Sequence, residues 1–219
     1  MAVGTSLGDM ILLSGFEPFG GDPTNPSWGA VQAARDILRA EGFDVEAVEL
    51  PCVFGESVHA LLLEIARLRP ELVISAGLAG GRDRLSLERV AINCDDARIP
   101  DNAGNRPVDE EVVPGGPAAY FSTLPVKAAL RALQIAGVRA EVSQTAGTYV
   151  CNHVFYGLMH HLATDVSGTR GGFIHVPREA TAGTAGGMSL QDMGEGIAVV
   201  VRAALATAQD LKVSAGAID

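Results

Sequence analysis

The chain has 219 residues, of which 47% are hydrophobic and only 5% are aromatic. This length allows one domain with a sizeable core. A formal net charge of −10 and the lack of any run of Lys or Arg argue against nucleic acid or an anionic membrane as a partner.

Strand-like and helix-like segments alternate in the first half of the chain. An apolar run at 9–14 predicts a strand, and Asn25-Pro26 predicts a helix start, with an N-cap and a proline at the first helical position. We expect that helix to reach about Ala40. The next predicted segments are a strand at 43–50, a helix containing Leu61–Leu68, a strand at Leu72–Ala76 and an extended stretch at 85–100 with a loop from Ile99.

The same alternation continues in the second half. The predicted segments are a helix at 125–136, a strand at 138–144, a helix from Val150, a strand at Gly172–Val176, a loop at 180–187, a last helix from Ser189 to about Gln209 and a loose tail at 213–219. Strands separated by helices predict an α/β fold. We expect one domain over residues 1–219, a three-layer α/β/α sandwich with a largely parallel mixed sheet.

Several segments with chemical potential follow directly after predicted strands. They are the loop Gly15–Gly21, the segment Gly77–Gly81, Cys151 and His175. Ligands of open α/β sheets bind beyond the carboxyl ends of the strands. We therefore expect these segments to meet at one edge of the sheet.

Cys151 is the candidate nucleophile because it lies in the first turn of a predicted helix. Unpaired N–H groups and the positive end of the helix dipole favour a thiolate at that position. The competing interpretation is a small buried hydrophobic residue, which is the commoner role of a lone cysteine.

A cysteine nucleophile needs a base, and His175 at the end of the last predicted strand is the best candidate. The other histidines lie on helices, three of them on the helix of the cysteine and mostly directed elsewhere: His59, His153, His160 and His161. A catalytic histidine also needs an orienting carboxylate. The sequence leaves four candidates open: Glu88, Asp95, Asp96 and Asp101.

Metal and cofactor sites are not expected. The three cysteines, Cys52, Cys94 and Cys151, have no metal-binding spacing and are predicted to be free thiols. Gly15–Gly21 has neither the P-loop ending nor the dinucleotide pattern. The chain shows no signal peptide and no window long enough to span a membrane, so a cytoplasmic location is predicted.

The chain resembles the pyroglutamyl peptidase I (pyrrolidone-carboxylate peptidase) family along nearly its whole length. The resemblance rests on ordered blocks: Ser14-Gly-Phe-Glu-Pro-Phe-Gly-Gly21, Asn25-Pro-Ser-Trp28, Ala79-Gly-Gly-Arg82, Glu88-Arg-Val-Ala-Ile-Asn93, Asp96-Ala-Arg-Ile-Pro-Asp-Asn102, Gly115-Gly-Pro-Ala-Ala-Tyr120, Ala146-Gly-Thr-Tyr-Val-Cys-Asn-His153 and Gly171-Gly-Phe-Ile-His-Val-Pro177. It implies an α/β/α sandwich and a cysteine peptidase that removes N-terminal pyroglutamate from peptides, and it suggests a cytoplasmic homotetramer.

The resemblance also implies residue roles. Cys151, His175 and Glu88 match the catalytic residues, and Arg98 matches an arginine near the oxyanion. The positions around the lactam ring are matched by Phe16, Phe19, Ile99, Tyr149 and Val150. The chain departs from the family pattern at Leu78, where some members have glutamine, at Cys52, where threonine is frequent, and after Pro177.

The proposed substrate suits an apolar pocket. Pyroglutamate carries no charged amine, whereas a free N-terminus would bury an unpaired ammonium at a cost of several kcal/mol. Two other functions on a similar fold stay open at this point: a nucleoside-phosphorylase-like enzyme and a non-catalytic pyroglutamate or small-ligand binding protein. Glu17 and Asp22 in the first loop argue against a phosphate site there.

Overall fold

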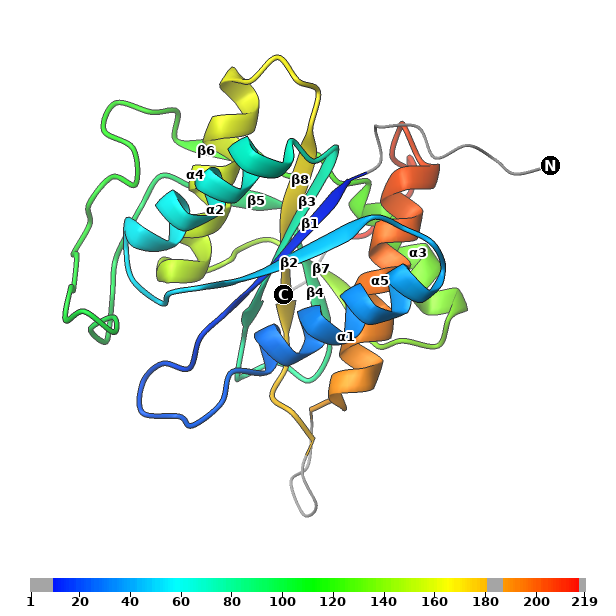
Figure 1. Cartoon of the computed structure of the whole chain (residues 1–219). Coiled ribbons are helices and arrows are strands. Elements are labelled where there is room, and N and C mark those ends of the chain that lie inside the picture. The colour runs from blue at the N-terminus through cyan, green and yellow to red at the C-terminus, as the bar shows by residue number, and fades with distance from the viewer. Residues whose placement is uncertain (1–9, 181–186, 217–219) are drawn as a thin grey trace.

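The computed structural model describes residues 10–180 and 187–216, and in these residues six strands form the central sheet, in the order β2-β1-β3-β8-β4-β7 (Figure 1). Four of them run parallel: β1 (Ile11–Phe16), β2 (Val45–Leu50), β3 (Leu72–Leu78) and β8 (Arg170–Val176). The other two, β4 (Leu85–Glu88) and β7 (Ala140–Ser143), are parallel to each other, and β4 is antiparallel to β8. The predicted mixed, largely parallel sheet is confirmed.

Helices cover both faces of this sheet (Figure 1). One face carries α1 (Pro26–Ala40), α3 (Val126–Ile135) and α5 (Leu190–Ala206), and the other carries α2 (Glu56–Leu68) and α4 (Val150–Thr164). Each pairing of helices and sheet encloses its own hydrophobic cluster. β1 is buried along its whole length, which explains why its sequence is a continuous apolar run rather than an alternating one.

The first loop is fixed at its far end by the start of α1. Asn25 is the N-cap and accepts a hydrogen bond from the backbone N–H of Ser27, and Pro26 begins the helix, as predicted. The Ser27 hydroxyl in turn accepts a hydrogen bond from the backbone N–H of Phe16 at 3.0 Å. The helix start is therefore tied to the carboxyl end of β1.

Some element boundaries differ from the prediction. The stretch predicted to be extended contains strands only to residue 92, because β5 (Val90–Ile92) leaves the central sheet and pairs with β6 (Ala119–Phe121). β6 was not predicted, since three residues between Gly- and Pro-containing segments carry no periodicity. α5 ends at Ala206, before Gln209. Of the predicted loop and tail, 181–186 and 217–219 lie outside the described residues.

Candidate active site

Cys151 is the second residue of α4. The N-cap residue Tyr149 is extended, and among residues 10–180 and 187–216 no side chain caps the first turn. Val150, Val154 and Leu158 are buried and fix the helix against the sheet. The first turn of α4 therefore presents uncapped backbone N–H groups beside the thiol, where an anion could bind.

The thiol lies against β3 at Gly77. A Cβ atom placed on Gly77 would come within 2.6 Å of Cys151 Sγ. In the parallel β3–β8 register, Gly77 is paired with His175. Paired residues of neighbouring strands direct their side chains to the same face of a sheet, so the thiol and the imidazole share one face at the carboxyl end of β3 and β8.

His175 is held from the other side by Glu88. The distance from His175 Nδ1 to Glu88 Oε1 is 2.7 Å, and the Glu88 side chain is completely buried. A carboxylate only accepts hydrogen bonds, so Nδ1 carries a proton and Nε2 of the neutral ring is left as the basic atom. Of the four carboxylates that the sequence left open, Glu88 is therefore the partner of His175.

Of the other three carboxylates, two have partners other than His175 and the third is exposed. Asp95 Oδ2 lies 2.7 Å from His153 Nδ1, while His153 Nε2 accepts a hydrogen bond from the backbone N–H of Gly55. Asp101 accepts hydrogen bonds from several backbone N–H groups of its own loop and from Phe54. Asp96 is exposed. Both ring nitrogens of His153 are thus engaged, which suits a structural histidine.

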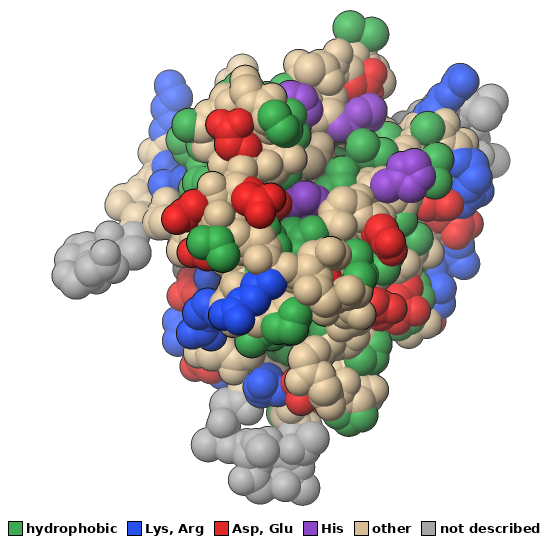
Figure 2. Space-filling view, turned by 90° about the vertical axis from the view of Figure 1, so that its left-hand side faces the viewer, with side chains coloured by type: hydrophobic (Ala, Val, Ile, Leu, Met, Phe, Trp, Pro, Cys, Tyr) green, Lys and Arg blue, Asp and Glu red, His purple; other side chains and the backbone are tan. Residues whose placement is uncertain are grey.

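The remaining histidines lie on the outer helices. His160 Nδ1 is 3.0 Å from the hydroxyl of Tyr120, and His59 is exposed on α2. In the view of Figure 2, histidine side chains gather in the upper part of the molecule, with acidic and basic side chains interspersed below them.

Arg82 was not singled out by sequence reasoning, although it ends the Gly-Gly-Arg segment after β3. Its Nη1 atom lies 2.6 Å from Glu88 Oε1, the same oxygen that faces His175. Its Nη2 atom donates to the backbone carbonyl of Thr145 at 3.0 Å. Its position after the end of a predicted strand could have marked it as a candidate site residue. Nothing in the sequence indicated that it would pair with the buried Glu88.

Burial opposes ionisation of the thiol at this position. Burial raises the pKa of the Cys151 thiol, Cys52 and Glu88 act in the same direction, and Arg82 opposes them. Removal of the thiol from water thus works against the helix terminus, which favours the thiolate. Attack by this sulfur requires a neighbouring base to take its proton.

The five residues matched to the lactam pocket fall into two groups. Phe16 and Val150 are buried members of the hydrophobic cluster beneath α4. Phe19, Ile99 and Tyr149 are more exposed and belong to loops at the carboxyl edge of the sheet. The Phe19 and Tyr149 ring centroids are 5.9 Å apart, and the Tyr149 hydroxyl donates to the Pro100 carbonyl at 3.1 Å.

Arg98 is exposed, and within the described part of the chain its side chain makes no hydrogen bond or ion pair. Its loop is tied to the segment before Cys151 on both sides of it. Asp96 and Thr148 exchange hydrogen bonds, and Tyr149 bonds to Pro100. Arg98 thus lies on a loop that hydrogen bonds hold in place, and within the described residues its guanidinium binds no protein group.

Leu78, one of the departures from the family pattern, ends β3 directly after Gly77. It lines a cavity of about 260 Å³ together with Asp22 and Arg178, which form an ion pair at 3.3 Å. This cavity lies at the same sheet edge as the thiol.

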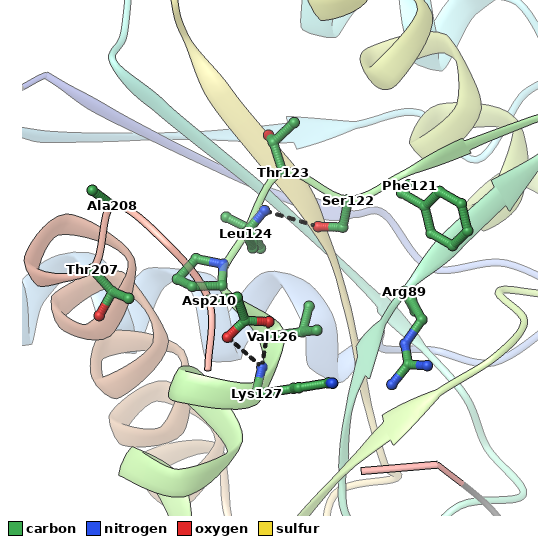
Figure 3. Close-up of a pocket in the computed structure, with 11 residues that line it drawn as sticks. Arg89, Phe121, Ser122, Thr123, Leu124, Val126, Lys127, Thr207, Ala208 and Asp210 are labelled. Carbon is green, nitrogen blue, oxygen red and sulfur yellow. Dashed lines mark hydrogen bonds between the residues drawn. The ribbon is translucent and has the colours of Figure 1, made fainter. Parts of the chain in front are cut away.

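A cavity of about 420 Å³ lies elsewhere, between Arg89, Phe121 and the start of α3 (Figure 3). None of the predicted site residues lines it. The Asp210 carboxylate there accepts hydrogen bonds from the backbone N–H groups of Lys127 and Ala128, at 3.1 and 2.9 Å. The start of α3 is therefore capped by a residue that follows α5.

Residues 10–180 and 187–216 hold no cluster of three or more His, Cys, Asp or Glu side chains placed to bind a metal ion. None of their helices combines the length and the apolar character that crossing a membrane requires.

Comparison with known proteins gives a consistent picture. The model of the family described as pyroglutamyl peptidase matches residues 9–207. A pyrrolidone-carboxylate peptidase of Clavibacter michiganensis is 53% identical over 212 residues, which cover 95% of this chain and 99% of that protein. One of Streptomyces coelicolor is 53% identical over 94% of this chain and 98% of its own length.

Solved structures agree with these relatives. The crystal structure of pyroglutamyl peptidase I from Bacillus amyloliquefaciens superposes with a TM-score of 0.89 at 40% identity, covering 94% of this chain and 100% of that one. A variant of the pyrrolidone carboxyl peptidase of Pyrococcus furiosus gives 0.82 at 39% identity, covering 90% and 98%.

Proposed function

Since the chain belongs to the pyroglutamyl peptidase family, we propose that it removes N-terminal pyroglutamate from peptides as a cysteine peptidase, with Cys151, His175 and Glu88 as its catalytic residues. One observation carries the assignment of residues. Cys151 Sγ lies against Gly77, the strand neighbour of His175, and His175 is hydrogen-bonded to the buried Glu88.

The reaction proceeds in two stages. His175 Nε2 takes the thiol proton as Sγ forms a bond to the pyroglutamyl carbonyl carbon. The C–N bond then breaks, and the imidazolium returns the proton to the departing peptide amine. Water, deprotonated by the same imidazole, attacks the thioester, and the released sulfur regains a proton. Glu88 keeps the ring in the tautomer with a free Nε2 and stabilises the transient imidazolium.

The oxyanion of each tetrahedral intermediate is met by backbone N–H groups of the first turn of α4, with Arg98 assisting. The uncapped helix start and the unpaired Arg98 guanidinium support these roles. Loss of one such donor typically costs about 3 kcal/mol of barrier.

The substrate pocket follows from the apolar side chains at this edge. Phe16 and Val150 form its floor, and Phe19, Ile99 and Tyr149 its rim. A lactam N–H adds no charge to such a site, whereas an ammonium would lose its hydration without a paired carboxylate. The specificity therefore comes from rejection of charged N-termini as well as from contacts to the ring.

The test compares Cys151→Ser with the matched variant Cys94→Ser, both assayed for release of a fluorogenic amine from its pyroglutamyl amide. We expect the first variant to keep its fold and lose turnover, and the second to act like the wild type. Turnover by Cys151→Ser at the wild-type rate would refute the nucleophile. Pyroglutamate binding by a wild-type protein that turns over no amide would instead indicate a binding protein.

The proposal includes a cytoplasmic homotetramer, as the family resemblance suggests. Three free cysteines suit a reducing compartment. Sedimentation equilibrium at micromolar concentration tests the assembly, and a monomeric mass would overturn it.

A further inference from the structure

The buried carboxylate behind His175 poses an electrostatic problem. Glu88 is completely buried, and its Oε2 atom has no hydrogen-bond partner among the described residues. An ionised carboxylate removed from water is costly unless a positive charge compensates it. A neutral His175 supplies a hydrogen bond but no charge, so the compensating charge for the Glu88 carboxylate must come from another group.

Arg82 is the group in position to do this. Its side chain is 26% exposed, while its Nη1 atom reaches Glu88 Oε1 at 2.6 Å. His175 Nδ1 approaches the same oxygen at 2.7 Å. A single carboxylate oxygen is thus fixed by two donors from different elements, which leaves it little freedom to rotate away from the ring.

The second arm of Arg82 reaches the segment that leads to the nucleophile. Nη2 donates to the carbonyl of Thr145, which also accepts a hydrogen bond from the Ser143 hydroxyl. Thr145 opens the loop between β7 and α4, and Cys151 lies in the first turn of that helix. The planar fork of arginine can span two acceptors in this way, whereas the point charge of lysine cannot hold both in fixed geometry.

From this geometry we propose that Arg82 is a positioning residue, which compensates the charge of the Glu88 carboxylate, holds it aimed at His175 and couples it to the loop preceding Cys151. The inference rests on the proposed function, because it assumes that His175 and Glu88 serve the thiol. Arg82 also lowers the pKa of the Cys151 thiol, which agrees with a charge held close to the reacting pair.

The test is a double-mutant cycle of Arg82→Met and Glu88→Gln. We expect Arg82→Met to lower kcat by about 100-fold with KM unchanged, as displacement of a catalytic group by about 1 Å would. In the Glu88→Gln background the same substitution should have almost no further effect, because Arg82 acts through Glu88. Arg82→Lys should fall between wild type and Arg82→Met. The matched control is Arg84→Met, whose guanidinium pairs with Asp83 on the same loop.

Two results would overturn the inference: a wild-type kcat in Arg82→Met, or the same loss in both backgrounds. If Arg82→Met fails to fold, Arg82→Lys decides, and a wild-type kcat in that variant is the contrary result. The rate of Cys151 alkylation by iodoacetamide at pH 7, measured over the same cycle, needs no turnover. It therefore tests the coupling even if the proposed peptidase activity is absent.

Discussion

Gly77 and Cys151 are in direct contact: the sulfur occupies the space that a side chain on Gly77 would fill, 2.6 Å from its Cβ position. Gly77 has ordinary strand geometry, so alanine fits the backbone there. The glycine is needed for the space it leaves open beside His175.

Gly77→Ala should therefore displace the thiol while keeping the fold. We expect kcat to fall by about 100-fold or more, measured with a pyroglutamyl fluorogenic amide. Gly81→Ala is the matched control, because a Cβ there would meet nothing within 4 Å. Equal rates for the two variants would contradict this placement of the sulfur.

Glu88→Gln tests the orienting carboxylate. Removal of the charge weakens control of the His175 tautomer and of the imidazolium, so kcat should fall by ~10²- to 10⁴-fold. KM should change little, since Glu88 is buried behind His175. Glu141→Gln, on the neighbouring strand β7, is the control, because its carboxylate bonds to Ser86 and pairs with Arg84 rather than with His175. A variant Glu88→Gln with full activity would remove Glu88 from the mechanism.

The second histidine–carboxylate pair should contribute to stability. His153→Phe keeps an aromatic ring beside Phe54 but leaves the Asp95 carboxylate buried without its hydrogen bond. Loss of one partner of a buried pair costs about 3 kcal/mol of unfolding free energy, measurable by urea denaturation. His59→Phe, at an exposed site, is the control. The idea fails if both variants unfold at the same urea concentration.

Alkaline pH should destabilise the protein through Cys52. Burial raises the pKa of Cys52 from 9.0 to about 12; the hydrogen bond with Tyr149 opposes this rise, and the Glu17 and Asp101 carboxylates add to it. Above pH 9 the unfolded thiol loses its proton while the folded one keeps it. The unfolding free energy therefore falls as pH rises, by about 1.4 kcal/mol per pH unit for this one group, until pH approaches the folded value.

Cys52→Ser removes that contribution. Urea unfolding between pH 9 and 11 should show a slope that is smaller by about 1.4 kcal/mol per pH unit in the variant. Identical slopes in the two proteins would show that Cys52 ionises equally in the folded and unfolded chain.

Much of the fold follows from local patterns, and much of the site does not. The apolar run of β1, the Asn25-Pro26 start of α1 and the helix that begins beside Cys151 are encoded within a few residues. The pairing of Glu88 with His175 depends on β4 lying beside β8. The end of β4 at Glu88 and the start of β8 at Arg170 are 82 positions apart in the sequence. Periodicity carries no information on such a contact.

For the same reason, the sequence could not show which of the candidate carboxylates is the partner of His175. Asp95 and Glu88 differ little in local sequence character, and only the tertiary structure assigns one to His153 and the other to His175. Burial of Cys151 likewise raises the pKa of the thiol, and the sequence around the helix start does not show how deeply the thiol is buried.

Asp210 gives a test of a long-range helix cap. Asp210→Ala should lower the unfolding free energy by about 0.5–2 kcal/mol, the usual cost of losing a cap, because two N–H groups of α3 lose their acceptor. Asp44→Ala, with an exposed side chain, serves as the control in the same urea titration. A stability equal to that of the control would show that water replaces the carboxylate without cost.

The reversed direction of β4 has a consequence for the layout of the catalytic machinery. Ser86 is paired with His175, and Glu88 with Phe173, so the chain of β4 descends from the rim toward the middle of the sheet. The acid thus approaches the imidazole from inside the protein, on the side away from the edge of the sheet. A strand of the opposite sense would carry its last residue outward and expose the anion to water. The inverted strand β4 thereby places the buried carboxylate on the interior side of the imidazole, away from the edge of the sheet where Cys151 lies.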